Sequence, residues 1–340
     1  MVKVGVAGYG VIGQRLADGV ALQKDMELVG IADVAPTLAV RALKEKGMPY
    51  KFYNALPANE GILKDAGIPI AGSMEDMIKK CDIILDSTSA GVGAQNKELY
   101  REFNKKAIFQ GGEKNSVADV FFHGYANYEK GLGKQFLKLT SCNTTGLIRA
   151  VDCLDRAVGV EKVAITIIRR VADPGDYHRG LTNALQVDKA PSHQAVDLMT
   201  IMPHIDATGI LIHTPVTHGH IITVCARTKK KIGKGEALTF FGEHQRIRIV
   251  RIADGFLGNA SLFRYARDLG NPRGDMYEIA LWEESIVNSG DDLMFAINIP
   301  QESVTIPETI DAIRSAMEMQ TDRIAGVSET NRYLGMGKWK

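Results

Sequence analysis

The chain lacks the features that mark several classes of protein. Its 340 residues include only four cysteines, widely scattered and without a CxxC pair, so they suit reduced thiols and offer no metal site. A net charge of +1 gives no electrostatic reason to bind nucleic acid or a membrane surface. No apolar run could span a bilayer, and the N-terminus begins as a strand with no room for a signal peptide. These absences predict a cytoplasmic globular protein, and the length suggests two domains.

A strand, a glycine-rich turn and a helix open the chain. Gly8 permits the tight turn, Gly10 lets a pyrophosphate approach the backbone, and Gly13 lets the helix pack closely. The next strand, residues 26–32, ends at Asp33, which is placed to bind a ribose 2′-hydroxyl and to repel a 2′-phosphate. The combination predicts a dinucleotide site that prefers NAD, with NADP as the second choice. A glycine-rich turn in another kind of α/β protein is the alternative interpretation.

Strands and helices continue to alternate as far as residue 110, which predicts a parallel, doubly wound sheet. Ligands of such sheets lie at the carboxyl ends of the strands, so Ser87, Thr88 and Gly111 are expected on the nicotinamide side. Ordinary loop chemistry would explain these three residues equally well. Residues 36–70 contain four prolines and are expected to form an irregular excursion without a role.

Cys142 lies where an apolar strand, residues 136–140, meets the start of a helical pattern. The free amides and the positive end of the helix dipole favour its ionised, nucleophilic form. The same amides could hold an oxyanion formed when the sulfur attacks a carbonyl. A small buried thiol without a chemical role is the alternative.

The second half groups its strands together and its helices apart, which predicts an α+β unit with an antiparallel or mixed sheet. One strand ends in Arg169 and Arg170, a candidate anion site or a solvated strand edge. His193 lies in a polar segment, residues 171–204, where it binds a phosphate or caps a turn. The alternation of charged and apolar residues after residue 246 slips at Val250, which suggests a bulge.

His218 and His220 flank Gly219 at the start of a further strand, and alternation would put both rings on one face. No other ligand accompanies them at metal-binding spacing, so no metal is predicted. If Cys142 is a nucleophile, one histidine is better explained as a general base near it.

Taken together, these segments resemble archaeal-type phosphorylating glyceraldehyde-3-phosphate dehydrogenases, from Val4 to the C-terminus. The resemblance rests on six motifs in order, Ala107 to Lys114, Ser141 to Gly146, Ile168 to Arg170, Pro191 to His193, His218 to His220 and Gln301 to Ser303. We therefore expect a Rossmann-type domain over residues 1–140, completed by a C-terminal helix within 303–340, and a catalytic domain over 141–302.

The resemblance implies a homotetrameric cytoplasmic enzyme of glycolysis and gluconeogenesis. In it, Cys142 attacks the aldehyde of glyceraldehyde 3-phosphate while His218 acts as the base. Hydride passes to NAD(P), and inorganic phosphate then releases 1,3-bisphosphoglycerate from the thioester. Water must be kept out while the thioester exists.

The resemblance also assigns binding positions. The cofactor positions are Val11, Ile12, Gly111, Gln301 and one of the two adjacent arginines, which we take to be Arg170. The substrate positions are Ser141, Asn143, Arg169, His193 and Gln194. Gln194 stands where we expect His in related sequences, and Asp33 stands where relatives that accept NADP carry Lys, which again favours NAD.

Two other functions remain open from the sequence. An aspartate-semialdehyde or N-acylglutamyl-phosphate type reductase would share the glycines, the Cys-Asn pair and the thioester. A dinucleotide-sensing protein with an inert Cys142 would share only the dinucleotide site.

Overall fold

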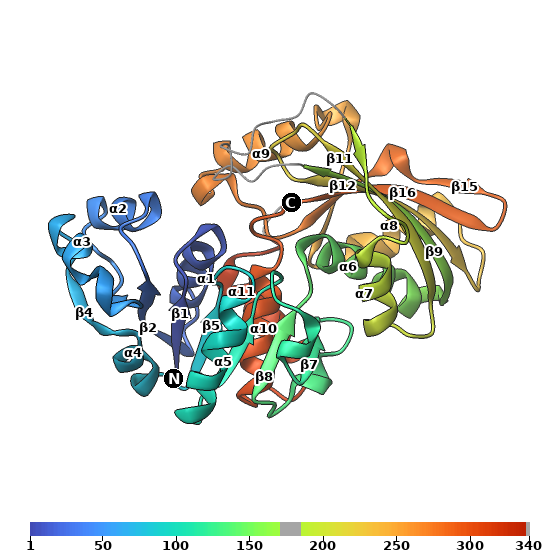
Figure 1. Cartoon of the computed structure of the whole chain (residues 1–340). Coiled ribbons are helices and arrows are strands. Elements are labelled where there is room, and N and C mark those ends of the chain that lie inside the picture. The colour runs from blue at the N-terminus through green and yellow to red at the C-terminus, as the bar shows by residue number, and fades with distance from the viewer. Residues whose placement is uncertain (171–184, 338–340) are drawn as a thin grey trace. The chain divides into compact units, whose positions relative to one another are not determined.

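The structure is a computed structural model that describes residues 1–170 and 185–337 (Figure 1). The chain divides into two compact units. The first joins Met1–Thr140 to Ile306–Gly335, and the second is built from Ser141–Thr305. The sequence analysis ends the catalytic domain at residue 302, whereas in the structure the second unit runs to Thr305 and the chain returns to the first unit at Ile306.

The first unit contains a parallel sheet, as predicted, and the structure gives it eight strands. The strand order is β4-β3-β2-β1-β5-β6-β8-β7. The strands are β1 (Val2–Ala7), β2 (Met26–Asp33), β3 (Phe52–Asn54), β4 (Ile70–Ser73), β5 (Ile83–Asp86), β6 (Lys106–Phe109), β7 (Val120–Phe122) and β8 (Phe136–Leu139). The chain leaves β1 toward β4 and then returns across the sheet to β5, which is the reversal of direction typical of a doubly wound fold.

Helices cover both faces of this sheet, because right-handed crossovers in opposite directions must lie on opposite faces. They are α1 (Val11–Ala21), α2 (Leu38–Glu45), α3 (Glu60–Asp65), α4 (Met74–Lys80), α5 (Val92–Glu102), α10 (Ile306–Ala316) and α11 (Arg323–Leu334). Met77 of α4 and Tyr100 of α5 belong to one buried cluster. Gly19 of α1 packs so closely on Ile306 that a Cβ there would lie 2.9 Å from the Ile306 side chain.

Two expectations for this unit are wrong. Residues 36–70 are not irregular, since they form α2, β3, α3 and β4 and add two strands to the sheet edge. Strands of three and four residues are too short for periodicity to reveal, and the prolines obscured them further. The single C-terminal helix is two helices, α10 and α11.

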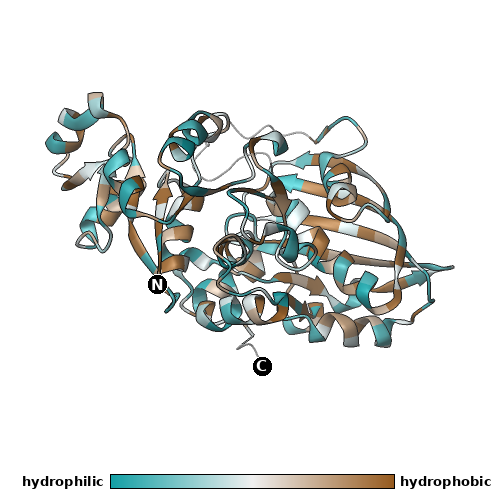
Figure 2. Ribbon diagram, turned by 90° about the horizontal axis from the view of Figure 1, so that it is seen from below, coloured by the Kyte–Doolittle hydropathy of each residue, from teal (hydrophilic) through white to brown (hydrophobic). Residues whose placement is uncertain are grey.

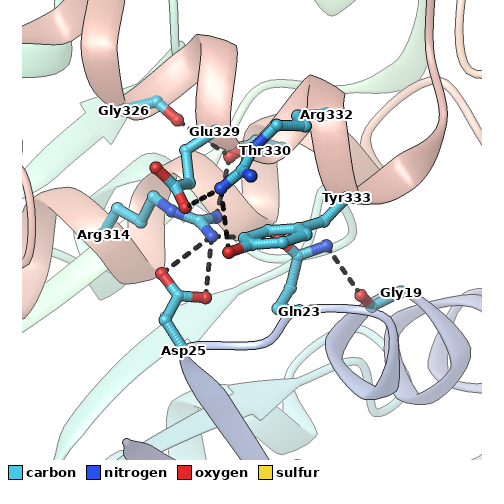
Figure 3. Close-up of polar contacts among 9 residues, drawn as sticks. All are labelled: Gly19, Gln23, Asp25, Arg314, Gly326, Glu329, Thr330, Arg332 and Tyr333. Carbon is cyan, nitrogen blue, oxygen red and sulfur yellow. Dashed lines mark hydrogen bonds and ion pairs between the residues drawn. The ribbon is translucent and has the colours of Figure 1, made fainter.

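A buried arginine ties the C-terminal helices to the start of the sheet (Figure 3). Arg314 of α10 is fully buried and donates hydrogen bonds to both carboxylate oxygens of Asp25, at 2.9 Å each. It also donates to Gln23 and, on α11, to Thr330. One side chain therefore joins α10, α11 and the turn before β2.

The second unit contains a mixed sheet, which confirms the predicted fold class. Its strand order is β10-β11-β9-β12-β16-β14-β13, with β15 paired to β16. The strands are β9 (Val160–Arg170), β10 (Gln186–Val187), β11 (Asp206–Thr214), β12 (His220–Thr228), β13 (Ile247–Val250), β14 (Ile279–Trp282), β15 (Val287–Ser289) and β16 (Asp292–Ile299). β9 is parallel to β11 and antiparallel to β12.

Three helices, α6 (Cys142–Val158), α7 (His193–Ile201) and α8 (Lys234–Glu243), lie on one side of this sheet, and α9 (Asn259–Asp268) lies on the other (Figure 1). Alternate residues of β12, such as Ile222 and Val224, are buried toward the three helices. In Figure 2 hydrophobic colour runs along much of these strands, whereas the helices show hydrophobic and hydrophilic colour side by side.

The structure corrects two further expectations in this unit. The segment around His193 is helical from that residue onward, while residues 171–184 of the same predicted loop lie outside the described part. The suspected bulge at Val250 is the end of β13, which pairs with β14 in continuous register. Within the described residues, no helix combines the length and apolar character needed to cross a membrane.

Candidate active site

The glycine turn of the first unit has the geometry that a dinucleotide needs. Gly8 adopts a φ of +84°, and a Cβ on Gly13 would lie 1.9 Å from the Gly8 carbonyl oxygen. Nothing lies within 4 Å of a Cβ built on Gly10, so the backbone there is open to a ligand. No side chain caps α1, whose first residues are Val11 and Ile12, so its leading amides can bind a pyrophosphate.

Asp33 lies at the end of β2 beside this turn. One carboxylate oxygen accepts the Tyr9 N–H at 2.7 Å, and the other accepts the Val34 N–H at 2.7 Å. Each oxygen keeps a second lone pair, so Asp33 can also accept a ribose hydroxyl. These contacts hold the Asp33 carboxylate at the end of β2, beside the glycine turn.

Two loops on the same edge of the sheet support the turn. Ser87, after β5, donates from its hydroxyl to the Gly8 carbonyl at 2.8 Å and so braces the glycine loop. Gly111, after β6, is exposed, and its loop is anchored by Glu113, which accepts the N–H groups of Gly91 and Gly93. Sequence analysis missed Glu113, because it is 20 residues from Gly93 and only the fold brings it to the start of α5.

Cys142 is the first residue of α6, as the strand-to-helix pattern predicts, and its side chain is partly exposed. Ser141 is the N-cap, and its hydroxyl accepts the Thr144 N–H at 3.3 Å. The sulfur therefore lies at the positive end of a 17-residue helix.

The start of α7 is attached to the start of α6. The Thr144 hydroxyl donates to the Asp197 carboxylate at 3.2 Å, and Asp197 is one turn along α7 from exposed His193. Three oxygens on these helix starts are buried without a hydrogen-bond partner: Asn143 Oδ1, Ser192 Oγ and Gln194 Oε1. Buried polar atoms without partners are uncommon, and a bound ligand or water would satisfy them.

The imidazole beside the sulfur is that of His220. Its Nε2 lies 3.7 Å from Cys142 Sγ, and its Nδ1 lies 3.1 Å from the Arg170 backbone nitrogen. Burial, and secondarily the charges of Arg170 and Arg169, lower the pKa of His220 from 6.5 to about 3. His220 is therefore neutral at physiological pH.

His218 lies elsewhere, which corrects the expectation that it is the histidine at the thiol. It is exposed, its Nδ1 lies 3.2 Å from the Thr217 hydroxyl, and its ring packs edge-on against Phe263. Gly219 has a φ of +70°, so the backbone turns before β12 begins at His220. The alternation argument fails because His218 precedes the strand.

Arg170 makes contacts within the protein rather than presenting its charge to solvent. Its side chain is 4% exposed, and it donates to the Thr217 carbonyl at 2.7 Å and to Glu302 Oε1 at 3.1 Å. Arg169 is only partly buried, and Gln301, next to Glu302, is also partly exposed. Arg169 is thus better placed than Arg170 to meet an anion.

No group of three or more potential metal ligands gathers anywhere in residues 1–170 and 185–337. The sequence analysis also missed Glu302 and Asp197. Glu302 lies in a motif that the resemblance uses, and a buried arginine requires an anion, but only the fold pairs the two.

Comparison with known proteins gives a consistent result. Residues 141–268 match the model of the C-terminal domain of glyceraldehyde 3-phosphate dehydrogenase. The chain is 37% identical to the glyceraldehyde-3-phosphate dehydrogenase of Methanothermobacter thermautotrophicus, over 99% of this chain and 100% of the relative. It is 40% identical to the enzyme of that name from Methanococcoides burtonii, over 98% of this chain and 99% of the relative.

Among solved structures, the aspartate semialdehyde dehydrogenase II of Vibrio cholerae has the same fold. The TM-score is 0.65 at 15% identity, over 93% of this chain and 98% of that one. That likeness concerns the fold alone. The identity to the two glyceraldehyde-3-phosphate dehydrogenases, 37% and 40%, is far higher and spans nearly the whole chain. The chain therefore belongs to the glyceraldehyde-3-phosphate dehydrogenase family, in the company of its archaeal members.

Proposed function

We propose that this protein oxidises glyceraldehyde 3-phosphate to 1,3-bisphosphoglycerate, reversibly and with inorganic phosphate, through a thioester on Cys142. The observation that carries the proposal is the partly exposed sulfur at the start of α6, with His220 Nε2 3.7 Å away. Glycolysis or gluconeogenesis in the cytoplasm is the corresponding setting.

The chemistry follows from the position of the sulfur. The start of α6 stabilises a thiolate, which attacks the aldehyde carbon, and the leading amides stabilise the negative charge that develops on oxygen. His220, in place of His218, is the imidazole that serves this step. A bound nicotinamide dinucleotide supplies the hydride acceptor. The resulting thioester conserves the energy of oxidation until phosphate attacks it.

The substrate's phosphate and the attacking phosphate need cations and hydrogen-bond donors. Ser141 and Asn143 flank the sulfur, and Arg169, His193 and Gln194 are proposed to bind the anionic groups. The partnerless oxygens of Asn143 and Gln194 support contact with the substrate's hydroxyl groups rather than its phosphate, because hydroxyls or water could donate to them. Gln194 brings no charge, so Arg169 must supply most of the attraction.

We propose that NAD is preferred over NADP. Asp33 carries a negative charge at the position that the ribose 2′ substituent approaches, which favours a hydroxyl and repels a phosphate. Gly8, Gly10, Gly13, Val11 and Ile12 would hold the pyrophosphate, with Ser87, Gly111 and Gln301 on the nicotinamide side. Arg170 is left out of the cofactor set because its guanidinium already bonds Thr217 and Glu302.

We also propose a homotetramer. Alternate residues of β9 and β11 point away from α6 and α7 and remain exposed or half exposed, including Ile168, Ile210 and Ile212. Isoleucines gathered on an exposed sheet face suit an interface between copies of a chain. Sedimentation equilibrium of the wild type and of Ile210→Lys tests this, since the charge should dissociate the tetramer. A wild type that sediments as a monomer would refute the assembly.

The test of the activity is reduction of NAD and of NADP, followed spectrophotometrically with glyceraldehyde 3-phosphate in the presence and absence of inorganic phosphate. We expect phosphate-dependent turnover, faster with NAD, and none from Cys142→Ser. The matched substrate control is aspartate semialdehyde. If the protein were instead a related reductase, it would prefer this aldehyde to glyceraldehyde 3-phosphate. Turnover of that aldehyde alone would overturn the proposal.

A further inference from the structure

Two loops run side by side at the carboxyl edge of the first sheet. One follows β5 and leads into α5, and the other follows β6. β5 lies between β1 and β6 in the sheet, so both loops are next to the glycine turn after β1. A Cβ built on Gly112 would meet the Ala90 side chain at 3.6 Å, which is van der Waals contact between the two loops.

Glu113, from the loop after β6, binds the end of the loop after β5. Its Oε1 accepts the backbone N–H of Gly91 at 2.8 Å and that of Gly93 at 3.0 Å. These amides open α5, whose N-cap residue is Gly91 and offers no side chain to cap it. One carboxylate oxygen can accept two donors, and bonds to a charged acceptor are stronger than those to a neutral one. Glu113 therefore supplies the cap that α5 lacks in its own sequence.

The backbone that receives this carboxylate requires glycine. Gly91 has a φ of +85°, in the left-handed region. A Cβ on Gly93 would lie 3.0 Å from Glu113 Oε1 and 3.2 Å from Asp86 Oδ1, which is closer than most Cβ atoms approach another atom. The two glycines thus shape the start of α5 to admit the Glu113 side chain.

The beginning of the loop after β5 is anchored in a different way. The Ser87 hydroxyl donates to the Gly8 carbonyl at 2.8 Å, and the Thr88 N–H donates to Asp86 Oδ1 at 3.1 Å. Neither bond involves Glu113. Replacing Glu113 should therefore release the far end of this loop and leave the brace on the glycine turn in place.

The position of the two loops indicates which part of a dinucleotide they would meet. In a doubly wound sheet the dinucleotide crosses the edge where the strand order reverses, which here lies between β1 and β5. Asp33, after β2, is the proposed contact of the adenosine ribose, and the start of α1 is the proposed site of the pyrophosphate. The nicotinamide half then extends over β5 and β6, where Glu113 joins the loops.

We propose that Glu113 is a positioning residue for the nicotinamide half of the cofactor. Its carboxylate holds the end of the loop after β5 against the loop after β6, so that the surface offered to the nicotinamide is ordered before the cofactor binds. Ordering a binding loop in advance strengthens binding because less conformational freedom is lost on association. The inference rests on the proposed function and adds a residue to the same dinucleotide site.

The test compares two ligands that differ only in the nicotinamide. NAD and ADP-ribose share the adenosine, the pyrophosphate and the second ribose, and calorimetry gives the affinity of each for the full-length protein. For Glu113→Ala we expect NAD to bind about tenfold more weakly, as for the loss of a net hydrogen bond or two. ADP-ribose should bind as it does to the wild type. Equal weakening of both ligands, or no change in either, would overturn the proposal.

Glu113→Gln separates the hydrogen bonds from other effects of the substitution. Its amide oxygen can still accept the Gly91 and Gly93 N–H groups, so we expect most of the NAD affinity to return. If Glu113→Gln bound NAD as weakly as Glu113→Ala, the hydrogen bonds would not be the cause and the proposal would fail. Glu102→Gln, at the exposed far end of α5, is the matched control and should bind both ligands as the wild type does.

These measurements need no aldehyde and no turnover. A protein that acted on another aldehyde would refute the proposed function and leave the expected affinities of NAD and ADP-ribose as they are. If the wild type binds NADP in preference to NAD, the same comparison is made with NADP and 2′-phospho-ADP-ribose, and the same outcomes decide.

Discussion

The two helix starts that we propose carry this protein's chemistry are built in different ways. At α1 the site is backbone, where Gly10 leaves the amides open and no side chain caps the helix. At α6 the helix is capped by Ser141, and the proposed reactive group is a side chain, that of Cys142, which meets His220 from β12. The first site depends on local shape, and the second depends on segments 78 residues apart being brought together. Substitutions at the two sites should therefore have different consequences: one at α1 should weaken NAD binding, and one at α6 should abolish turnover.

The largest effect is expected at α6. Cys142→Ser replaces the thiolate with a hydroxyl that is hardly ionised, so turnover should fall by at least about 10⁴-fold, as when the nucleophile of a catalytic unit is removed. NAD binding, measured by calorimetry, should survive because the proposed site of the cofactor's phosphates is at α1. Cys225→Ser, at another partly exposed cysteine, is the matched control and should keep activity. Substantial activity in Cys142→Ser would refute the thioester mechanism.

The second prediction is the converse: a substitution at α1 that should weaken NAD binding and leave the reactivity of Cys142 unchanged. Gly13→Ala places a methyl group 1.9 Å from the Gly8 carbonyl oxygen, so the glycine turn must shift. Overpacking of this size costs about 1–3 kcal/mol, which corresponds to about 5- to 150-fold weaker NAD binding if the loss falls on the cofactor. Alkylation of Cys142 by iodoacetamide should keep its rate. Gly61→Ala, in α3, is the control for the added methyl, because its Cβ meets nothing within 4 Å.

This comparison also explains which features could be predicted from the sequence. The glycine turn, Asp33 and the position of Cys142 depend on residues close in sequence, so the pattern of strand, turn and helix was sufficient. The choice between His218 and His220 was not predictable, because it depends on the left-handed backbone at Gly219 and on an amide from β9. Glu302 is 132 residues from Arg170, and only the fold pairs them.

A third prediction concerns acid stability. The pKa of His220 is about 3 in the folded protein and near 6.5 unfolded, so the unfolded chain binds a proton that the folded chain does not. The stabilising contribution is complete above pH 6.5 and declines as the pH falls toward 3, by about 1.4 kcal/mol per pH unit. His220→Gln should flatten this slope in urea unfolding measured over the same range. His218→Gln, at an exposed site, should leave the slope as in the wild type, and an identical slope in all three proteins would contradict the assignment.

The smallest effect is expected at the proposed dinucleotide site, where Asp33 should set the preference for NAD over NADP. Asp33→Lys removes the charge that repels a 2′-phosphate and adds one that attracts it, while also removing the acceptor for the Tyr9 and Val34 amides. We expect the ratio of kcat/KM for NADP to that for NAD to rise by about tenfold or more, since one charge-assisted hydrogen bond contributes about 1.5–3 kcal/mol. Asp33→Asn separates the two effects, because it keeps an oxygen for one amide without the charge, and it should shift the ratio by less. The change should appear in KM for the dinucleotide rather than in the pH profile of kcat, because α6 and His220 are untouched. If Asp33→Lys lowered kcat with both cofactors and left their ratio unchanged, the carboxylate would be only a brace for the glycine turn, and selectivity would have to come from elsewhere.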